Sequence, residues 1–549
     1  MREDNKCRYI TRETAITIGA TVIWYLFAHG YRFSNNMYSH DALLEICQND
    51  SAWQIALGRF VHPVLIFLRG NLCSPWLICI CAMVWICLGS CLLVQMLKLR
   101  RCGSIIIITG VMVCNPALIS TNAAFLQCVD FYGLALFLSI LGVWLCRGKG
   151  WRRRICGVAA LTLAMGIYQA YICVSIVLVM ILLLRESQEN TEWRVVFKRA
   201  LFYGGMLLLS AVLYYLIWKL FLLAFGFEAA DSYNGMASLG DYSDISVVSL
   251  LALVYRKVLQ YFWNPDTFVT MTFRGITLSV VWKYILRCAN IAVLAGLLWN
   301  VAAINRKRKT GLWQRLFQAG ILLLLPAGMN FVCIMSKGMV HTLMVYAFVL
   351  LYVLAVALAE AGCCREVEAD EKGSLRGGQE NRQKTVSGTG IAREGSFLGK
   401  TGSAWKQVIV WAPVLCVIWS NAVYANQTYL KKELQERALT SMMTRIVAQI
   451  EGTEGYIPGV TPVAFSGTFE NSPYLQQIAG FEELRPYGMG DTTLTYVGTD
   501  YAFLQYEVSV LMNYTRIAAT EPEVMSMPTY PEQGSIGYVG DILVIKISD

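Results

Sequence analysis

Long apolar runs separated by short polar segments dominate the pattern of this chain. Residues 105–113, 176–184 and 343–359 are runs of this kind. Apolar runs that approach about 20 residues are typical of membrane-spanning helices. A soluble protein would instead show shorter buried runs with polar faces between them. The pattern therefore predicts a mainly α fold, a polytopic transmembrane helical bundle.

Three short basic clusters set the expected topology. Residues 98–101, 147–154 and 306–309 lie between apolar runs, and Lys and Arg accumulate in cytoplasmic loops. The N-terminus resembles the start of a signal peptide, but no small-residue cleavage site follows, so residues 14–29 are expected to be a retained first span. We therefore expect a multi-pass protein of the cytoplasmic membrane with a cytoplasmic N-terminus.

Two apolar stretches are bounded by basic residues on both sides, so each is expected to cross the membrane twice. They are residues 103–146 and residues 155–184. A single helix over 155–184 would be about 45 Å long, too long for a hydrocarbon core of about 30 Å. The first stretch is expected to turn outside between Asn115 and Asp130. The second is expected to be a hairpin of short helices with residues 168–171 at its outer tip.

The same reasoning gives about eleven spans over residues 1–425. Residues 31–73 form a first outer loop, in which residues 51–68 are expected to fold as one or two short interfacial helices. Residues 228–275 form a second outer loop with an amphipathic helix near 247–262 and a turn at 264–266. The Gly-, Arg-, Glu- and Gln-rich residues 362–405 are typical of a disordered cytoplasmic loop.

The character of the chain changes at residue 426. A helix-like start leads into short strand-like pieces such as residues 462–466 and 540–547. Residues 426–549 therefore predict a small α+β domain on the extracytoplasmic side, just large enough for a modest core of its own.

Composition supports the membrane class and excludes others. The 549 residues are 56% hydrophobic and 15% charged, against about 25% charged residues in soluble domains. The formal charge of +9 does not indicate a nucleic-acid surface, because basic residues cluster in short segments between apolar runs. Nearly all of the 18 Cys lie in apolar runs and the chain has four His, so no zinc site, other metal site or cofactor is expected.

With this topology, polar side chains converge on the outer rim of the bundle. The first outer loop contributes Arg32, Tyr38, His40, Asp41 and Arg59. The hairpin tips and a later connection contribute Asp130, Tyr168, Gln169, Tyr171, Lys337 and His341. The middle of the spans holds few ionisable groups, which argues against a transport pathway.

A site on the outer rim suits a lipid-anchored sugar donor. The phosphate of a polyprenyl-phosphate sugar lies at the interface, and the acceptor hydroxyl comes from water. Transfer then needs a carboxylate as base, for which Asp41 is the candidate. It also needs cations on the departing phosphate, for which Arg59, Arg32, Lys337 and His341 are candidates. By analogy with glycosidases, a single base opposite the leaving group implies inversion at the anomeric carbon.

Each of these residues also has a structural interpretation. Asp41 is a favoured N-cap for residues 42–47, and Asp130 stands at the start of a span in the same way. Arg59 could reach to lipid phosphates, while Tyr168 and Tyr171 could be interfacial aromatics. Gln169 lies in an apolar run and needs a hydrogen-bond partner.

The chain resembles the bacterial Gtr-type (type two) O-antigen glucosyl transferase family, whose members are similar to membrane glycosyltransferases of the GT-C fold. The resemblance covers about the first 190 residues and rests on Tyr38-Ser39-His40-Asp41, Gly58-Arg59, Asp130-Phe131-Tyr132 and Tyr168-Gln169-Ala170-Tyr171. In the family the first motif is often a paired acid. Here His40 takes the first place, which leaves Asp41 as one carboxylate for base duty and removes the paired carboxylates that a metal would need.

The resemblance implies an enzyme that moves a glucosyl or related hexosyl group from polyprenyl phosphate to a cell-envelope glycan. His40, Tyr38, Asp130, Tyr168, Gln169 and Tyr171 would then support the reaction or bind the acceptor. A donor synthase and a flippase would be implied partners. Three alternatives remain, namely a transporter or flippase of lipid-linked sugars, a glycan polymerase or ligase, and a non-catalytic envelope protein.

Overall fold

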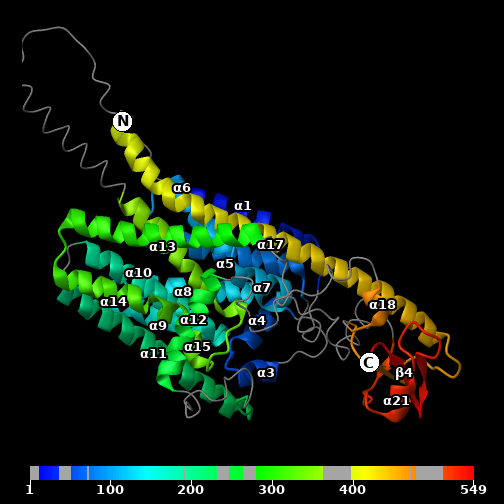
Figure 1. Ribbon diagram of the computed structural model, residues 1–549. Coiled ribbons are helices and arrows are strands. Elements are labelled where there is room, and N and C mark those ends of the chain that lie inside the picture. Colours follow the sequence, from blue (N-terminus) through cyan, green and yellow to red (C-terminus); the bar gives the residue numbers. More distant parts are fainter. Residues whose placement is uncertain are drawn as a thin grey trace, which may run out of the picture.

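The computed structural model describes residues 11–35, 37, 51–70, 73–189, 192–230, 246–263, 280–362, 397–469, 471–477 and 511–549. Figure 1 shows a bundle of helices and a small sheet near the C-terminus, joined by one long helix. The predictions for Tyr38, His40 and Asp41, and for the turn at 264–266, fall outside the described residues.

The first half of the bundle runs from α1 to α10. Its elements are α1 (Arg12–Ser34), α3 (Ser51–Ala56), α4 (His62–Arg69), α5 (Pro75–Met96), α6 (Cys102–Val113), α7 (Pro116–Ala124), η1 (Leu126–Cys128), α8 (Val129–Cys146), α9 (Trp151–Ile167), η2 (Gln169–Tyr171) and α10 (Ile172–Gln188). Helix α8 is central, because it packs against α5, α9 and α10. The two short helices α3 and α4 occupy the segment where interfacial helices were predicted.

The second half of the bundle covers α10 and α1 from outside. Its elements are α11 (Trp193–Phe225), α12 (Val247–Trp263), α13 (Val280–Arg308), α14 (Leu312–Met329), α15 (Phe331–Met335), η4 (Thr342–Met344), η5 (Tyr346–Val349), the apolar helix Tyr346–Gly362 and α17 (Phe397–Glu451). Helix α12 is the predicted amphipathic helix. It buries Leu250, Val254, Val258 and Tyr261, which recur at the spacing of one helix face.

Seven helices among the described residues are long and apolar enough to cross a membrane. They lie within Pro75–Met96, Cys102–Ala124, Leu126–Cys146, Gln169–Gln188, Trp193–Phe225, Tyr284–Arg308 and Gln407–Glu451. The other expected spans correspond to α1, α9, α14 and Tyr346–Gly362, which are shorter or more polar. The chain therefore has the helices of a multi-pass membrane protein, and the count of eleven spans stays a prediction.

Two of the basic clusters, residues 98–101 and 147–154, meet at one end of the bundle. Arg147 Nη1 donates to the Met96 carbonyl oxygen at 3.4 Å, and Arg185 Nη1 donates to the next carbonyl, that of Leu97. The main-chain nitrogens of Arg100 and Arg101 both donate to Glu360 Oε1, at 2.7 and 3.2 Å. The ends of α5, α8, α10 and Tyr346–Gly362 therefore lie together with the start of α6. Residues of the two clusters thus lie on one side of the bundle, and the assignment of that side to the cytoplasm stays a prediction.

Both predicted hairpins are present, and the first contains a cap. Asn115 Oδ1 accepts from the Leu118 nitrogen at 3.0 Å, and Pro116 occupies the first helical position of α7. Asn and Pro are favoured at these two positions, so the chain begins a new helix here and turns back only at η1. In the second hairpin, α9 and α10 have 17 residues each, and Tyr168 and η2 form the tip between them.

Helices α8 and α9 touch through two glycines. A Cβ added at Gly157 would lie 2.6 Å from Cys146 Sγ and 2.9 Å from the Gly142 carbonyl oxygen. Such distances require the helices to move apart. We expect Gly157→Ala to destabilise the protein by about 1–3 kcal/mol, the usual cost of overpacking, as measured by melting temperature in detergent.

The matched control for Gly157→Ala is Gly204→Ala in α11, where an added Cβ meets nothing within 4 Å. That variant should keep the wild-type melting temperature or exceed it, because Ala favours the helix. Equal melting temperatures for the two variants would show that the α8–α9 contact tolerates separation.

Helix α17 joins the bundle to the C-terminal sheet without a break. The expected boundary between residues 425 and 426 falls inside this helix, which runs on to Glu451, so the domain boundary stays a prediction. The strands are β1 (Pro462–Ser466), β2 (Asn513–Tyr514), β3 (Ile536–Val539) and β4 (Ile542–Lys546), with short helices α18 (Pro473–Gln476) and α21 (Pro522–Ser526). Strands β1 and β4 match the two strand-like pieces read from the sequence.

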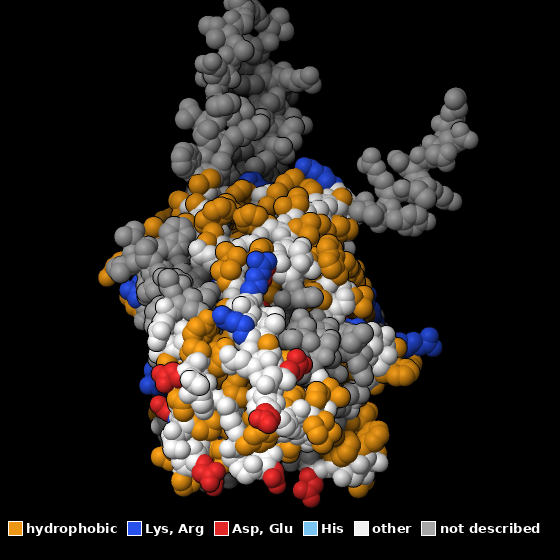
Figure 2. Space-filling model, turned by 90° about the vertical axis from the view of Figure 1, so that its right-hand side faces the viewer, with side chains coloured by type: hydrophobic (Ala, Val, Ile, Leu, Met, Phe, Trp, Pro, Cys, Tyr) orange, Lys and Arg blue, Asp and Glu red, His pale blue; other side chains and the backbone are white. Residues whose placement is uncertain are grey.

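The sheet has the order β2-β1-β4-β3. Strand β1 pairs in parallel with both β2 and β4, while β3 and β4 form an antiparallel hairpin. Residues 511–549 carry five acidic and two basic side chains. Acidic side chains (red) lie along the lower edge of the view in Figure 2, on the side of the C-terminal strands. The two ends of the molecule thus differ in charge.

Candidate active site

The segment α3–α4 lies across the tips of both hairpins, at the end of the bundle opposite the basic clusters. The Val61 nitrogen donates to the Gly166 carbonyl oxygen at 3.1 Å. Gln169 Nε2 donates to the Leu57 carbonyl oxygen at 2.7 Å. Arg69 Nη1 donates to the Gln127 carbonyl oxygen at 2.7 Å. The hairpin tips, which were predicted to contribute to the outer rim, are therefore buried under two short helices.

Asp130 forms a buried ion pair with Arg69. Arg69 Nη1 lies 2.7 Å from Asp130 Oδ1, and the two side chains are only 6% and 7% exposed. Asp130 is in the first turn of α8, where a carboxylate is favoured by the helix dipole. The Arg69 guanidinium also lies over the Phe131 ring, 4.3 Å from its centroid. The sequence identified Asp130 as a candidate and missed its partner.

His62 is a buried residue within electrostatic range of two arginines. Its ring is fully buried, and its centroid is 5.1 Å from that of Phe131. Burial, together with the neighbouring guanidinium groups of Arg59 and Arg69, holds the pKa of His62 well below its usual value. The imidazole is therefore neutral at physiological pH. Sequence reasoning did not select His62.

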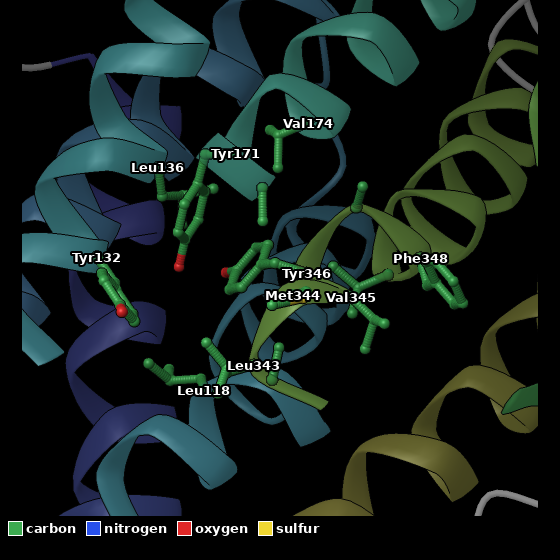
Figure 3. Packing of buried hydrophobic residues seen from close by; sticks show 14 of the residues in the cluster. Leu118, Tyr132, Leu136, Tyr171, Val174, Leu343, Met344, Val345, Tyr346 and Phe348 are labelled. Atoms are coloured by element: carbon green, nitrogen blue, oxygen red, sulfur yellow. The ribbon is translucent and has the colours of Figure 1, made fainter. Parts of the chain in front are cut away.

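A line of aromatic rings runs inward from Arg59. The Arg59 guanidinium lies 5.0 Å from the Tyr168 ring centroid, and Tyr168 stacks on Tyr132 at 4.4 Å. The ring centroid of Tyr171 lies 6.1 Å from that of Tyr132 and 6.0 Å from that of Tyr346. Figure 3 shows the hydroxyl ends of Tyr171 and Tyr346 pointing toward each other, from separate elements. The predicted residues Arg59, Tyr168 and Tyr171 are thus brought together with Tyr132.

Gln169 holds the α3–α4 connection in place. Its Nε2 donates to Tyr214 Oη at 2.8 Å as well as to the Leu57 carbonyl oxygen, and Tyr214 Oη donates to the Gly58 carbonyl oxygen at 3.2 Å. An added Cβ at Gly58, whose φ is +81°, would lie 2.2 Å from Tyr214 Oη. A side chain at residue 58 would therefore displace this network. The network holds the backbone next to Arg59, whose guanidinium lies over the Tyr168 ring.

Arg32 binds main-chain carbonyls at the C-terminal end of α1. Its Nε donates to the Asn122 carbonyl oxygen at 2.9 Å, Nη1 to that of Asn35 at 2.9 Å and Nη2 to that of Met37 at 2.7 Å. Lys432 Nζ donates to the Ala123 carbonyl oxygen. The two cations thus satisfy the last carbonyls of α7, a favoured place for positive charge. A phosphate-binding role for Arg32 stays a prediction.

The start of the first outer loop is anchored close to the Asp130 site. Met37 is fully buried, and Arg32 holds its carbonyl oxygen. Cys79 Sγ contacts Asn122 Oδ1 at 3.7 Å, and this thiol lies within electrostatic range of both Arg32 and Asp130. Asp41 follows Met37 by four residues, a length of chain that spans at most about 14 Å.

Lys337 and His341 lie in the connection between α15 and η4. Helix α15 packs against η2, and η4 packs against α7, so this connection is at the same end of the bundle as the Arg69–Asp130 pair. His341 is buried, while Lys337 adopts a positive φ of 50°. Their roles toward a phosphate stay predictions. Within the described part of the chain, no cluster of His, Cys, Asp and Glu is arranged to hold a metal ion.

Comparison with known proteins identifies the family. The model of the family described as "Glucosyl transferase GtrII" matches residues 30–352. This range is more than half of the chain, and it contains α3, α4, both hairpins and η4. No curated protein and no solved structure matches the chain. The chain therefore belongs to the glucosyl transferase GtrII family and is a membrane glycosyltransferase.

Proposed function

We propose that this protein transfers a glucosyl or related hexosyl group from a polyprenyl-phosphate sugar to an envelope glycan, with inversion at the anomeric carbon. The reaction takes place on the extracytoplasmic face of the cytoplasmic membrane. One observation carries the proposal beyond the family match. A buried group of two arginines, one aspartate and stacked tyrosines lies at the end of the bundle opposite the basic clusters.

The location of this group fits a lipid-anchored donor. Basic clusters favour the cytoplasmic side, which puts the Arg69–Asp130 end at the outer interface. Cations at this depth stabilise the charge that develops on the departing phosphate. The C-terminal part, which follows α17 away from the bundle (Figure 1), then lies on the side from which the acceptor glycan approaches.

The chemical step conserves atoms and charge. The acceptor hydroxyl gives its proton to the Asp41 carboxylate as its oxygen forms a bond to the anomeric carbon. The bond between that carbon and the phosphate oxygen breaks on the opposite face, and polyprenyl phosphate leaves. Attack opposite the leaving group inverts the configuration. No metal is needed in this scheme, since guanidinium groups stabilise the leaving phosphate.

The proposal is tested by the composition of the envelope glycan. A strain that lacks the gene should lose one side-branch hexose, and the wild-type gene on a plasmid should restore it. The hexose is measured in hydrolysed glycan by chromatography. A synthase and a flippase for the donor are expected to be needed as partners. An unchanged glycan in the deletion strain, under conditions where the protein is made, would contradict the proposal.

A further inference from the structure

The buried guanidinium group of Arg69 has one hydrogen-bonded edge and one edge whose donors lack a partner among the described residues. Nη1 donates both to the Gln127 carbonyl oxygen and to Asp130 Oδ1, each at 2.7 Å. Nε and Nη2 are buried and have no hydrogen-bond partner among the residues that the structure describes. Buried donors of this kind are rare and costly. Their presence indicates that a ligand completes the site.

The Nε–Nη2 edge of Arg69 has the donor geometry of a phosphate-binding group. Nε and Nη2 present parallel N–H donors that match two oxygens of one phosphate. Asp130 occupies the opposite edge and fixes the orientation of the planar group. Neutral His62 and the Arg69 guanidinium both contact the Phe131 ring, and Arg59 adds positive potential near His62.

Helix α4 also offers a path from the lipid. Arg69 is at its last turn, and the opposite face of the helix carries Val64, Phe67 and Leu68, which are 52%, 85% and 73% exposed. These exposed apolar side chains suit a lipid chain rather than water. A ligand with a phosphate head and an apolar tail therefore fits α4 better than free phosphate does.

We propose that Arg69 binds the phosphate of the polyprenyl donor through its Nε–Nη2 edge, with Asp130 as the positioning residue and the exposed face of α4 in contact with the polyprenyl chain. This inference rests on the proposed function, since it assigns the lipid phosphate to that site. It adds to the expected phosphate ligands a residue that the sequence did not select.

The test measures binding of polyprenyl phosphate, the leaving group, to the purified full-length protein in nanodiscs. Polyprenol and inorganic phosphate are measured in parallel, which separates the contributions of tail and head. Arg69→Lys keeps the positive charge and loses the pair of parallel N–H donors. We expect it to bind polyprenyl phosphate about 10- to 100-fold more weakly, the loss expected for charge-assisted hydrogen bonds. Asp130→Asn should weaken binding less, because an amide oxygen still accepts from Nη1.

The control substitution is Arg199→Lys. Arg199 pairs with Glu186 at 2.9 Å at the basic end of the bundle, so this variant should bind like wild type. Wild-type binding by Arg69→Lys would overturn the inference. So would equal affinity for polyprenol and polyprenyl phosphate in the wild type. If inorganic phosphate binds as tightly as polyprenyl phosphate, the proposed contact between α4 and the polyprenyl chain is overturned.

A second measurement covers the case in which Arg69→Lys does not fold. A benzophenone amino acid at the exposed residue Phe67 should crosslink to labelled polyprenyl phosphate, and excess unlabelled polyprenyl phosphate, but not polyprenol, should prevent it. Leu208, which is 67% exposed on α11, is the control position, where competition should be absent. If excess polyprenyl phosphate does not reduce crosslinking at Phe67, the inference is contradicted.

The two proposals fail separately. If lipid-phosphate binding depends on Arg69 but the protein adds no hexose to the glycan, the binding inference stands and the proposed transfer reaction is rejected. Hexose transfer that is normal in a folded Arg69→Lys variant with wild-type lipid binding would reject the inference alone.

Discussion

Replacing Asp41 with Asn should reduce hexosyl transfer by about 10²- to 10⁴-fold, the usual contribution of a general base. Asn keeps the size of the side chain and removes its ability to accept the acceptor proton. Asp41 lies outside the described residues, but Met37 is anchored by Arg32 near the Asp130 site. The measurement is the hexose content of the envelope glycan in a deletion strain that makes the variant at wild-type level.

The control for Asp41→Asn is Glu45→Gln, which removes a carboxylate from the same outer loop. This control should restore the hexose as wild type does. Full restoration of the hexose by Asp41→Asn would remove Asp41 as the base. Asp130 would then become the candidate base, or the transporter hypothesis would be favoured.

Replacing Asp130 with Ala should destabilise the protein by about 3–5 kcal/mol, the usual result when one partner of a buried ion pair is removed. Arg69 would keep its charge in a site where it is only 6% exposed. Asp130 and Arg69 lie on different elements, α8 and α4, so loss of the pair should also free α4 from the hairpin tips. The measurement is the melting temperature of the purified protein, with its shift converted to free energy.

Two further variants separate the charge effect from other causes. Glu186→Ala breaks an ion pair whose Arg199 side chain is 49% exposed, and exposed pairs contribute less than about 1 kcal/mol. The double variant Asp130→Ala, Arg69→Met removes both charges and should recover most of the lost stability but not hexosyl transfer. If the double variant has the same melting temperature as Asp130→Ala, the unpaired charge of Arg69 is not the cause of the lost stability.

Much of the helical architecture could be predicted from the sequence. Apolar runs and basic clusters were enough to predict both hairpins, because the number of crossings between two basic clusters follows from the thickness of a bilayer. The tip at residues 168–171 and the strands β1 and β4 were predicted on local grounds. The resemblance in the first 190 residues led to the family that the comparison shows.

Hydropathy alone did not define where the helix that leaves the bundle ends. The sequence predicted a domain boundary near residue 425, where hydropathy falls, and α17 runs past this point to Glu451, so the boundary stays a prediction. Hydropathy reports which segments favour lipid. It does not report where a helix ends once it has left the lipid.

Only the tertiary structure decided which polar groups meet. Arg69 and Asp130 are 61 residues apart, and Gln169 meets Leu57 across 112 residues. A side chain near the end of an apolar run gives the same local pattern whether it reaches toward lipid phosphate or pairs inside the protein. The difference depends on α3 and α4 folding back over the hairpin tips. The sequence by itself therefore determined a membrane bundle, its hairpins and its family, whereas long-range packing decided that Arg69 is the partner of Asp130, because contacts between distant segments leave no local pattern in the chain.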